Sequence, residues 1–109
     1  MRKGKVYCNH ILAGEIRELD SGGYQFEYDQ LFFNDSQMPA ISVTLPKNKK
    51  VHASDTLFPF FFNMLSEGAN RQLQCQLLKI DKDDDFGLLL QTADAESVGA
   101  ITVTAMIND

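Results

Sequence analysis

The sequence is poor in the residues that usually hold small proteins together by covalent or metal bonds. It has no tryptophan, two cysteines and two histidines among 109 residues. Cys8 and Cys75 lie far apart and form no C-x-x-C pair, so we expect free thiols in a reducing compartment. His10 and His52 have no cysteine, histidine or acid at metal-ligand spacing. We therefore expect no disulfide, no metal and no cofactor.

The chain also lacks an excess of basic residues and any long apolar run. Ten Lys and Arg against fifteen Asp and Glu give a formal charge of −5, and such a field repels phosphate backbones and anionic lipid. The longest apolar run, residues 57–65, contains Pro59 and Asn63 and falls far short of the ~20 residues of a membrane-spanning helix. No signal-peptide core follows the basic start. These shortages predict a cytoplasmic protein that contacts neither membrane nor, directly, nucleic acid.

The apolar residues that are present suffice for one core. Hydrophobic residues make up 44% of the chain, with eight phenylalanines and three tyrosines. A chain of this length buries roughly two-thirds of its unfolded surface. We expect a single domain over residues 1–109.

Alternating apolar residues predict a small antiparallel sheet. A hairpin that turns at Asn9-His10 is expected over residues 5–19, because asparagine tolerates a positive φ. A second turn at residues 20–23 leads to another strand. The further strands are expected around residues 24–28, 41–45 and 101–107, and the last of these is expected to rejoin the first sheet. Residues 46–54 are expected to form a polar and basic surface loop.

Three helices are expected between these strands. Ser54 or Asp55 is predicted to cap a helix that has Pro59 in its first turn and ends near Leu65. A spacing of three and four residues predicts an amphipathic helix with the apolar positions Ala69, Leu73, Leu77 and Ile80. Asp84 or Asp85 is predicted to cap a short helix that carries Phe86, Leu88, Leu89 and Leu90. The expected fold class is α+β, a small antiparallel sheet packed with a cluster of about three helices.

Two charged clusters suggest ligands, but the surrounding residues favour simpler roles. Residues 81–85 place acids at alternate positions, as a calcium-binding loop does, yet Phe86 stands where that loop needs glycine and Thr92 where it needs glutamate. We favour an acidic helix-capping turn. Lys47, Lys49 and Lys50 have no interleaved aromatic residues and are expected in a solvated loop.

The most unusual segment is residues 58–68, which holds four phenylalanines within five positions. Successive helical residues point about 100° apart, so these rings cannot all face one core. We give equal weight to a helix buried on two sides and to a partly exposed docking face.

Several motifs in fixed order carry a resemblance to a known family. Residues 63–68 and Arg71 follow the pattern Asn-Leu-Leu-Pro-Glu-Gly and then Arg, with Met64 and Ser66 departing from it. An Asp-Phe pair at Asp85 and Phe86 precedes a Leu pair, and Gly99-Ala100 precedes a strand. Residues 6–9 and 42–46 resemble an opening hairpin and a Ser-Leu-Pro strand end. The whole order resembles the N-terminal subdomain of HipA-type kinases, the toxins of bacterial persistence operons.

The resemblance implies a function in a bacterial toxin–antitoxin system without catalysis. HipA kinases continue with a phosphate-binding loop and with catalytic and magnesium-binding aspartates, and we expect no kinase activity because that set cannot be assembled from these residues. Stand-alone copies of this subdomain, called HipS, partner a shortened kinase and a separate helix-turn-helix DNA-binding protein. The resemblance therefore implies a HipS-like antitoxin that binds and inhibits a HipA-like serine/threonine kinase toxin.

We expect the docking surface within residues 58–71, with Glu67 and Arg71 forming ion pairs at its rim. The predicted partner-binding residues are Phe58, Phe60, Phe61, Phe62, Leu65, Ser66, Glu67, Gly68 and Arg71. The motif positions predicted to be structural are Asn63, Asp85, Phe86, Gly99 and Ala100. Two alternatives stay open: an activating or structural subunit that completes the kinase, and operator-DNA binding through the lysines of residues 47–50.

Overall fold

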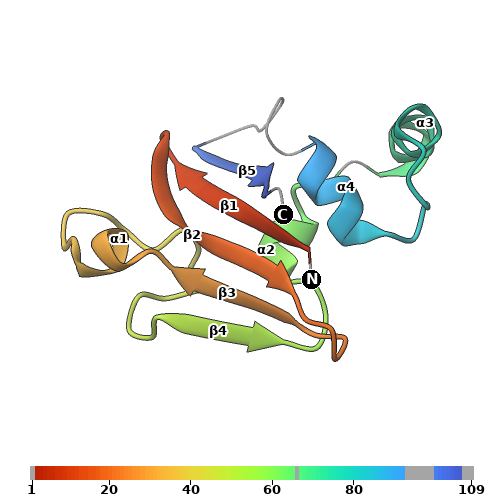
Figure 1. Cartoon of the computed structure of the whole chain (residues 1–109). Helices are drawn as coiled ribbons and strands as arrows, with labels where there is room; N and C mark the ends of the chain where they lie inside the picture. Colours follow the sequence, from red (N-terminus) through yellow and green to blue (C-terminus); the bar gives the residue numbers. More distant parts are fainter. Residues whose placement is uncertain (1, 66, 93–99, 107–109) are drawn as a thin grey trace.

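A computed structural model describes residues 2–65, 67–92 and 100–106. Its elements in chain order are β1 (Lys3–Cys8), β2 (Ile11–Glu18), β3 (Tyr24–Tyr28), α1 (Gln30–Asn34), β4 (Val51–Ser54), α2 (Pro59–Phe62), α3 (Gly68–Leu78), α4 (Asp85–Thr92) and β5 (Ile101–Ala105). The strands form one antiparallel sheet in the order β4-β3-β2-β1-β5 (Figure 1). The predicted α+β class is confirmed. None of the described helices has the length and apolar character needed to cross a membrane.

The predicted hairpin and the last strand are confirmed. Asn9 and His10 have φ values of 49° and 69°, which a two-residue turn between right-twisted strands requires. β5 returns to pair with β1, and the core residues Val103 and Val6 lie opposite each other. The first and last described strands are therefore neighbours in the sheet.

The prediction of a strand at residues 41–45 is wrong. The Ser42 hydroxyl accepts the Thr44 N–H, and the Leu45 N–H donates to the Ser42 carbonyl, so the segment closes into a local turn. Val43 consequently points into solvent, whereas Ile41 and Leu45 are buried. The Tyr28 hydroxyl accepts the Ile41 N–H and donates to the Leu45 carbonyl, which ties the turn to β3.

The prediction of a loop over residues 46–54 is wrong for its last four positions. Val51–Ser54 form β4, an edge strand that pairs with β3 along residues 24–27. The strand has only four residues, and its alternation of Val51 and Ala53 with His52 and Ser54 is too short to distinguish it from a loop. Pairing with the strongly alternating β3 decides its conformation.

The helices differ from expectation mainly at their ends. The helix predicted from residues 54 or 55 begins only at Pro59 and ends at Phe62, because proline is favoured at the first helical position and residues 51–54 are in β4. The short helix α1 was not predicted; the Asp29 carboxylate caps it by accepting the Leu31 N–H. α3 confirms the predicted helix at Ala69, Leu73 and Leu77, but the left-handed C-cap Lys79 ends it at Leu78, so the prediction is wrong for Ile80. α4 begins as expected, since Asp84 accepts the Gly87 N–H.

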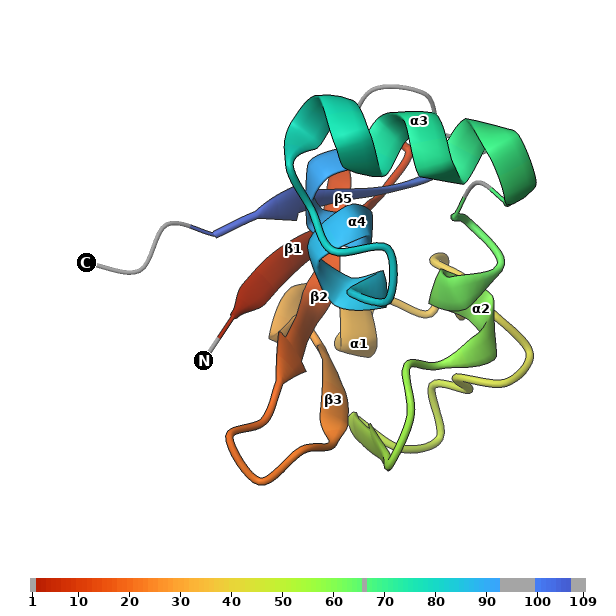
Figure 2. The same ribbon diagram turned by 90° about the vertical axis from the view of Figure 1, so that its right-hand side faces the viewer.

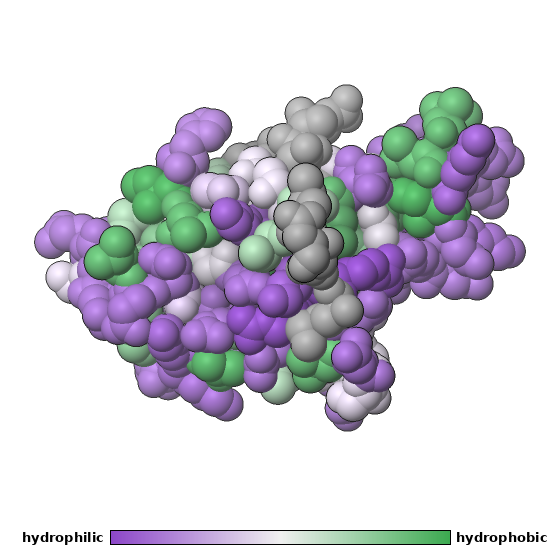
Figure 3. Space-filling model, viewed as in Figure 1, coloured by the Kyte–Doolittle hydropathy of each residue, from purple (hydrophilic) through white to green (hydrophobic). Residues whose placement is uncertain are grey.

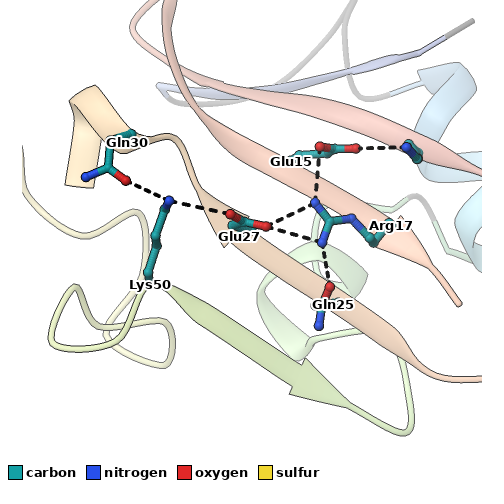
Figure 4. A network of polar contacts seen from close by, with 7 residues as sticks. Glu15, Arg17, Gln25, Glu27, Gln30 and Lys50 are labelled. Carbon is teal, nitrogen blue, oxygen red and sulfur yellow. Dashed lines mark hydrogen bonds and ion pairs between the residues drawn. The ribbon is translucent and has the colours of Figure 1, made fainter.

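The core lies on one face of the sheet, beneath α2 and α4 (Figure 2). Strand residues such as Ile16 and Phe26 meet Phe61 of α2 and Leu88 of α4 in one buried cluster. The alternate strand positions carry charges on the opposite face. There a ladder of polar contacts runs across the sheet (Figure 4), and its members are Lys3, Glu15, Arg17, Gln25, Glu27, Gln30 and Lys50.

Candidate functional site

The structure divides the phenylalanine-rich segment between core and surface. Phe61 is fully buried against the rings of Phe26 and Phe58. Phe58 and Leu65 are buried as well. Phe62 is 42% exposed, and Phe60 is only partly buried against the core. The segment therefore anchors the core and leaves the Phe62 ring partly in solvent, and its use as a docking face stays a prediction.

The remaining residues predicted for docking have distinct positions. Glu67 is exposed and stands at the N-cap of α3 with an extended backbone. Gly68 has a φ of 62° with open space around it, so its backbone conformation rather than crowding favours glycine. Ser66 lies outside the described residues. Glu67 and Gly68 set the backbone conformation at the start of α3.

Arg71 is not a free cation at a rim. Its Nε and Nη2 atoms donate to the Lys82 carbonyl at 3.2 and 2.8 Å, and Nη2 also donates to the Asp85 carboxylate. Lys82 precedes α4 and Asp85 is its first residue. The guanidinium therefore joins α3 to the start of α4.

The motif residues predicted to be structural have the following positions where they are described. Asn63 ends α2, with its N–H bonded to the carbonyls of Pro59 and Phe61. Phe86 is fully buried, and the Ala100 carbonyl accepts the Asn9 N–H at 2.9 Å. Gly99 lies outside the described residues.

The apolar side of α3 faces away from the rest of the protein. Leu73 and Leu77 are 54% and 73% exposed, and Ala69 is exposed beside them. Cys75, only 5% exposed, is the buried residue of this helix. A step of two residues turns a helix by about 200°, so Cys75 points opposite to Leu73. We call Ala69, Leu73 and Leu77 the α3 stripe.

Two views place this helix at one end of the molecule. α3 lies beyond α4 as seen from the sheet (Figures 1 and 2). The space-filling view shows apolar surface over α3 at that end (Figure 3). The sequence predicted the amphipathic helix but not the direction of its apolar side.

The surface around the α3 stripe carries no charge along the helix. Arg71 is the one charged residue in the sequence GANRQLQCQLL, and it points toward α4. Amides flank the stripe instead, at Asn70, Gln72, Gln74 and Gln76. Charged residues stand at the two ends, Glu67 before the helix and Lys79 after it. Surface helices that face water usually carry charges, whereas the centres of protein interfaces are depleted of them and have polar rims.

The lysines of the DNA-binding alternative are largely engaged within the protein. Lys47 donates to the carbonyls of Asp35 and Met38 at 2.8 and 2.7 Å, and its ammonium lies 5.0 Å from the centre of the Phe32 ring. Lys50 donates to Gln30 at 2.7 Å and lies 3.6 Å from Glu27. These contacts weaken the case for a phosphate-binding loop.

The acidic run caps and clamps α4. Asp81 accepts the Asp83 N–H, and Asp84 caps the helix at Gly87. Asp84 also receives two hydrogen bonds from Arg2, which hold the pKa of this carboxyl below its ordinary value despite partial burial. The helix-capping interpretation of this run is confirmed.

A groove on the outer face of the sheet is another candidate site. It has a volume of about 210 Å³ and is lined by ladder residues such as Glu15, Arg17 and Lys50. Arg17 already bonds Glu15 and Glu27 at 3.2 and 3.3 Å. Because these charges neutralise one another, the groove is a weaker candidate site than the α3 stripe.

The fold and its surface define an α+β domain with an uncharged, outward-facing helix. Comparison with known families identifies the family to which this domain belongs. The family model "HipA N-terminal domain" matches residues 4–104, so the chain belongs to that family.

Individual relatives agree with this assignment. A solved structure of the N-terminal domain of HipA toxin superposes with a TM-score of 0.75 at 27% identity, covering 100% of this chain and 96% of that one. An uncharacterized protein of Haemophilus influenzae is 31% identical over 103 residues, which cover 94% of this chain and 92% of the relative. A putative kinase of Sinorhizobium fredii is 26% identical over 84 residues, 77% of this chain but 20% of that protein.

Proposed function

We propose that this protein is a non-catalytic antitoxin that binds and inhibits a HipA-like serine/threonine kinase toxin. Family membership supports this, and so does the putative kinase of Sinorhizobium fredii, in which a similar segment makes up 20% of a longer chain. A domain that packs beside a kinase within one chain keeps the complementary surface when it is a separate molecule. A helix-turn-helix protein is proposed as a third component, with no direct DNA contact by this chain.

The outward-facing α3 stripe is the observation that carries the proposal. Leu73 and Leu77 remain exposed although burial of each side chain is favourable by roughly 1.5–3 kcal/mol. Their amide-lined, charge-free surroundings suit a surface covered by protein. The occupant we propose is the kinase portion of a HipA-like protein, since that is the remainder to which such a domain is linked in the longer relative.

The predicted docking residues then fall into two groups. Phe62, Glu67 and the partly buried Phe60 are proposed to contact the kinase together with the α3 stripe. Phe58, Phe61 and Leu65 are proposed to support this surface from within, because they are buried in the core. Gly68, with its positive φ, is proposed to set where α3 begins.

The first experiment tests whether the α3 stripe binds the kinase. We expect Leu77→Glu to weaken binding to a HipA-like kinase from the same genome by about 100-fold, because a carboxylate replaces the most exposed leucine of the apolar stripe. Leu31→Glu is the matched control: Leu31 is 81% exposed on α1, at the other end of the molecule. Calorimetric titration measures both affinities. Equal affinities of the two variants would exclude the α3 stripe as the docking surface.

The activating alternative predicts the opposite effect on turnover. An inhibitor at saturation lowers kinase autophosphorylation and relieves growth arrest in cells that express the kinase. An activating subunit raises the first and deepens the second. Full kinase activity at saturating antitoxin would contradict the inhibitory function even if binding is tight.

A further inference from the structure

The attachment of α3 to the rest of the protein is sparse. The helix begins and ends at residues with positive φ, Gly68 at 62° and Lys79 at 57°. Cys75 is its one buried residue. Among the described residues, the side-chain hydrogen bonds that join α3 to other segments come from Arg71. The orientation of α3 between these two positive-φ residues therefore depends on few contacts.

The observed orientation places the less apolar side of the helix inward. The inward side presents Arg71, Cys75 and the 43% exposed Leu78, and the outward side presents the stripe. A roll of about half a turn would bury Leu73 and Leu77 against the body, which apolar burial alone favours. Such a roll would carry Cys75 into solvent. Some specific contact has to hold the helix against it.

We propose that Arg71 is a positioning residue that keeps the α3 stripe turned outward for a partner. Its guanidinium bonds a backbone carbonyl at Lys82 and the carboxylate of Asp85. Both acceptors lie at the start of α4, whose next residues Phe86 and Leu88 are fully buried. The hydrogen bonds of Arg71 therefore join α3 to a segment that is anchored in the core.

The chemistry of arginine suits this position. A planar guanidinium bonds a carbonyl and a carboxylate at once in fixed directions, whereas an ammonium is a compact charge without that geometry. The bonds also explain why the one charge of α3 points inward. The use of this orientation by a kinase rests on the proposed function, but the orientation itself is measurable on the protein alone.

The two buried thiols report the orientation. Cys75 lies on the inward side of α3, and Cys8 is buried in β1. Iodoacetamide modification followed by peptide mass spectrometry gives a separate rate for each thiol. We expect Arg71→Ala to raise the rate at Cys75 at least tenfold and to leave the rate at Cys8 unchanged. A faster reaction at Cys75 alone reports exposure of that thiol.

Further variants distinguish the effect of the Arg71 contact from a general loss of stability. Asp85→Asn and Arg71→Lys are expected to raise the Cys75 rate by smaller factors, because each retains part of the bonding. Arg17→Ala is the matched control, since it removes an arginine from the ladder on the far face of the sheet. This control is expected to leave Cys75 protected.

The outcomes distinguish the inference from the proposed function. An unchanged Cys75 rate in Arg71→Ala would overturn the positioning role. Equal acceleration at Cys75 and Cys8 would also overturn it, because the contact would then hold the whole fold. Acceleration at Cys75 with unchanged kinase affinity would uphold the orientation and refute docking through α3. We expect acceleration together with at least tenfold weaker kinase binding.

Discussion

Replacing Arg2 with alanine is expected to lower the free energy of unfolding by about 2.5 kcal/mol at neutral pH. Arg2 precedes β1 and joins two distant segments. Nε and Nη2 donate to the Glu18 carboxylate at 2.9 Å each, and Nη1 and Nη2 donate to Asp84 at 2.8 and 2.9 Å. The guanidinium also lies 5.5 Å from the centre of the Phe86 ring.

The size of this stability loss follows from the ion pairs of Arg2, each reduced for exposure to solvent. The Arg2 side chain is 42% exposed, so each bidentate pair is taken at the upper end of exposed ion pairs, about 1 kcal/mol. The contact with the Phe86 ring adds about 0.5 kcal/mol at such a site. For a domain whose net stability is roughly 5–15 kcal/mol, a loss of this size is readily measured.

The pH dependence gives the prediction its sharpest form. Hydrogen bonds from Arg2 hold the pKa of Asp84 below its ordinary value. A carboxyl with a lowered folded pKa contributes stability above its unfolded pKa of about 3.9, and that stability is lost as the pH falls through the folded pKa. The difference between the wild-type protein and Arg2→Ala is therefore largest near pH 6 and shrinks toward pH 2.

Urea unfolding at a series of pH values measures this difference. Lys49→Ala is the matched control, because it removes the same charge from an exposed position and is expected to change stability by less than about 0.5 kcal/mol. A stability difference for Arg2→Ala that stays constant from pH 6 to pH 2 would refute the reasoning. So would equal effects of the two variants.

Two further substitutions test the packing of the sheet. Gly14→Ala is expected to lower the free energy of unfolding by about 3 kcal/mol or more, because a Cβ there would lie 2.4 Å from the Glu27 carbonyl oxygen and 2.8 Å from Phe26 Cζ. Thermal melting measures this against Gly22→Ala, where space is open but φ is 103°. A melting temperature for Gly14→Ala no lower than that of Gly22→Ala would contradict the prediction. Tyr28→Phe is expected to cost about 1–2 kcal/mol because it leaves the Ile41 N–H and Leu45 carbonyl without their partner. Hydrogen exchange checks this second change, and an unaltered exchange rate at Ile41 would contradict it.

Elements with local signals were predictable from the sequence. The hairpin turn follows from Asn9, since this residue type tolerates a positive φ, and the start of α4 follows from an aspartate three residues before Gly87. The strand of residues 24–28 follows from its strict alternation of aromatic and polar residues. In each case the deciding interaction lies within a few residues of the pattern.

Elements that depend on distant partners were not predictable. Residues 41–45 alternate like a strand, yet the hydroxyl of Tyr28 holds them as a turn. β4 has only four residues, too few for their alternation to predict a strand, and takes its conformation from pairing with β3. Arg71 was predicted to form ion pairs at an interface rim, and the sequence did not indicate that Asp85 would be its partner within the protein.

The candidate site was found only in part. The periodicity of Leu73 and Leu77 gives an apolar stripe, but periodicity alone does not say whether the stripe faces the core or a partner. One signal was present in the sequence: Arg71 is the single charge within residues 68–78. A helix without charges on its solvent side indicates a covered surface.

The most direct test of the account is the affinity of this protein for a HipA-like kinase, measured by calorimetry for the wild-type protein, Leu77→Glu and Leu31→Glu. The account predicts that Leu77→Glu binds about 100-fold more weakly than the wild type, and that Leu31→Glu binds within twofold of it. Wild-type affinity in Leu77→Glu, or no binding by the wild-type protein, would contradict the claim that α3 docks this domain on a kinase.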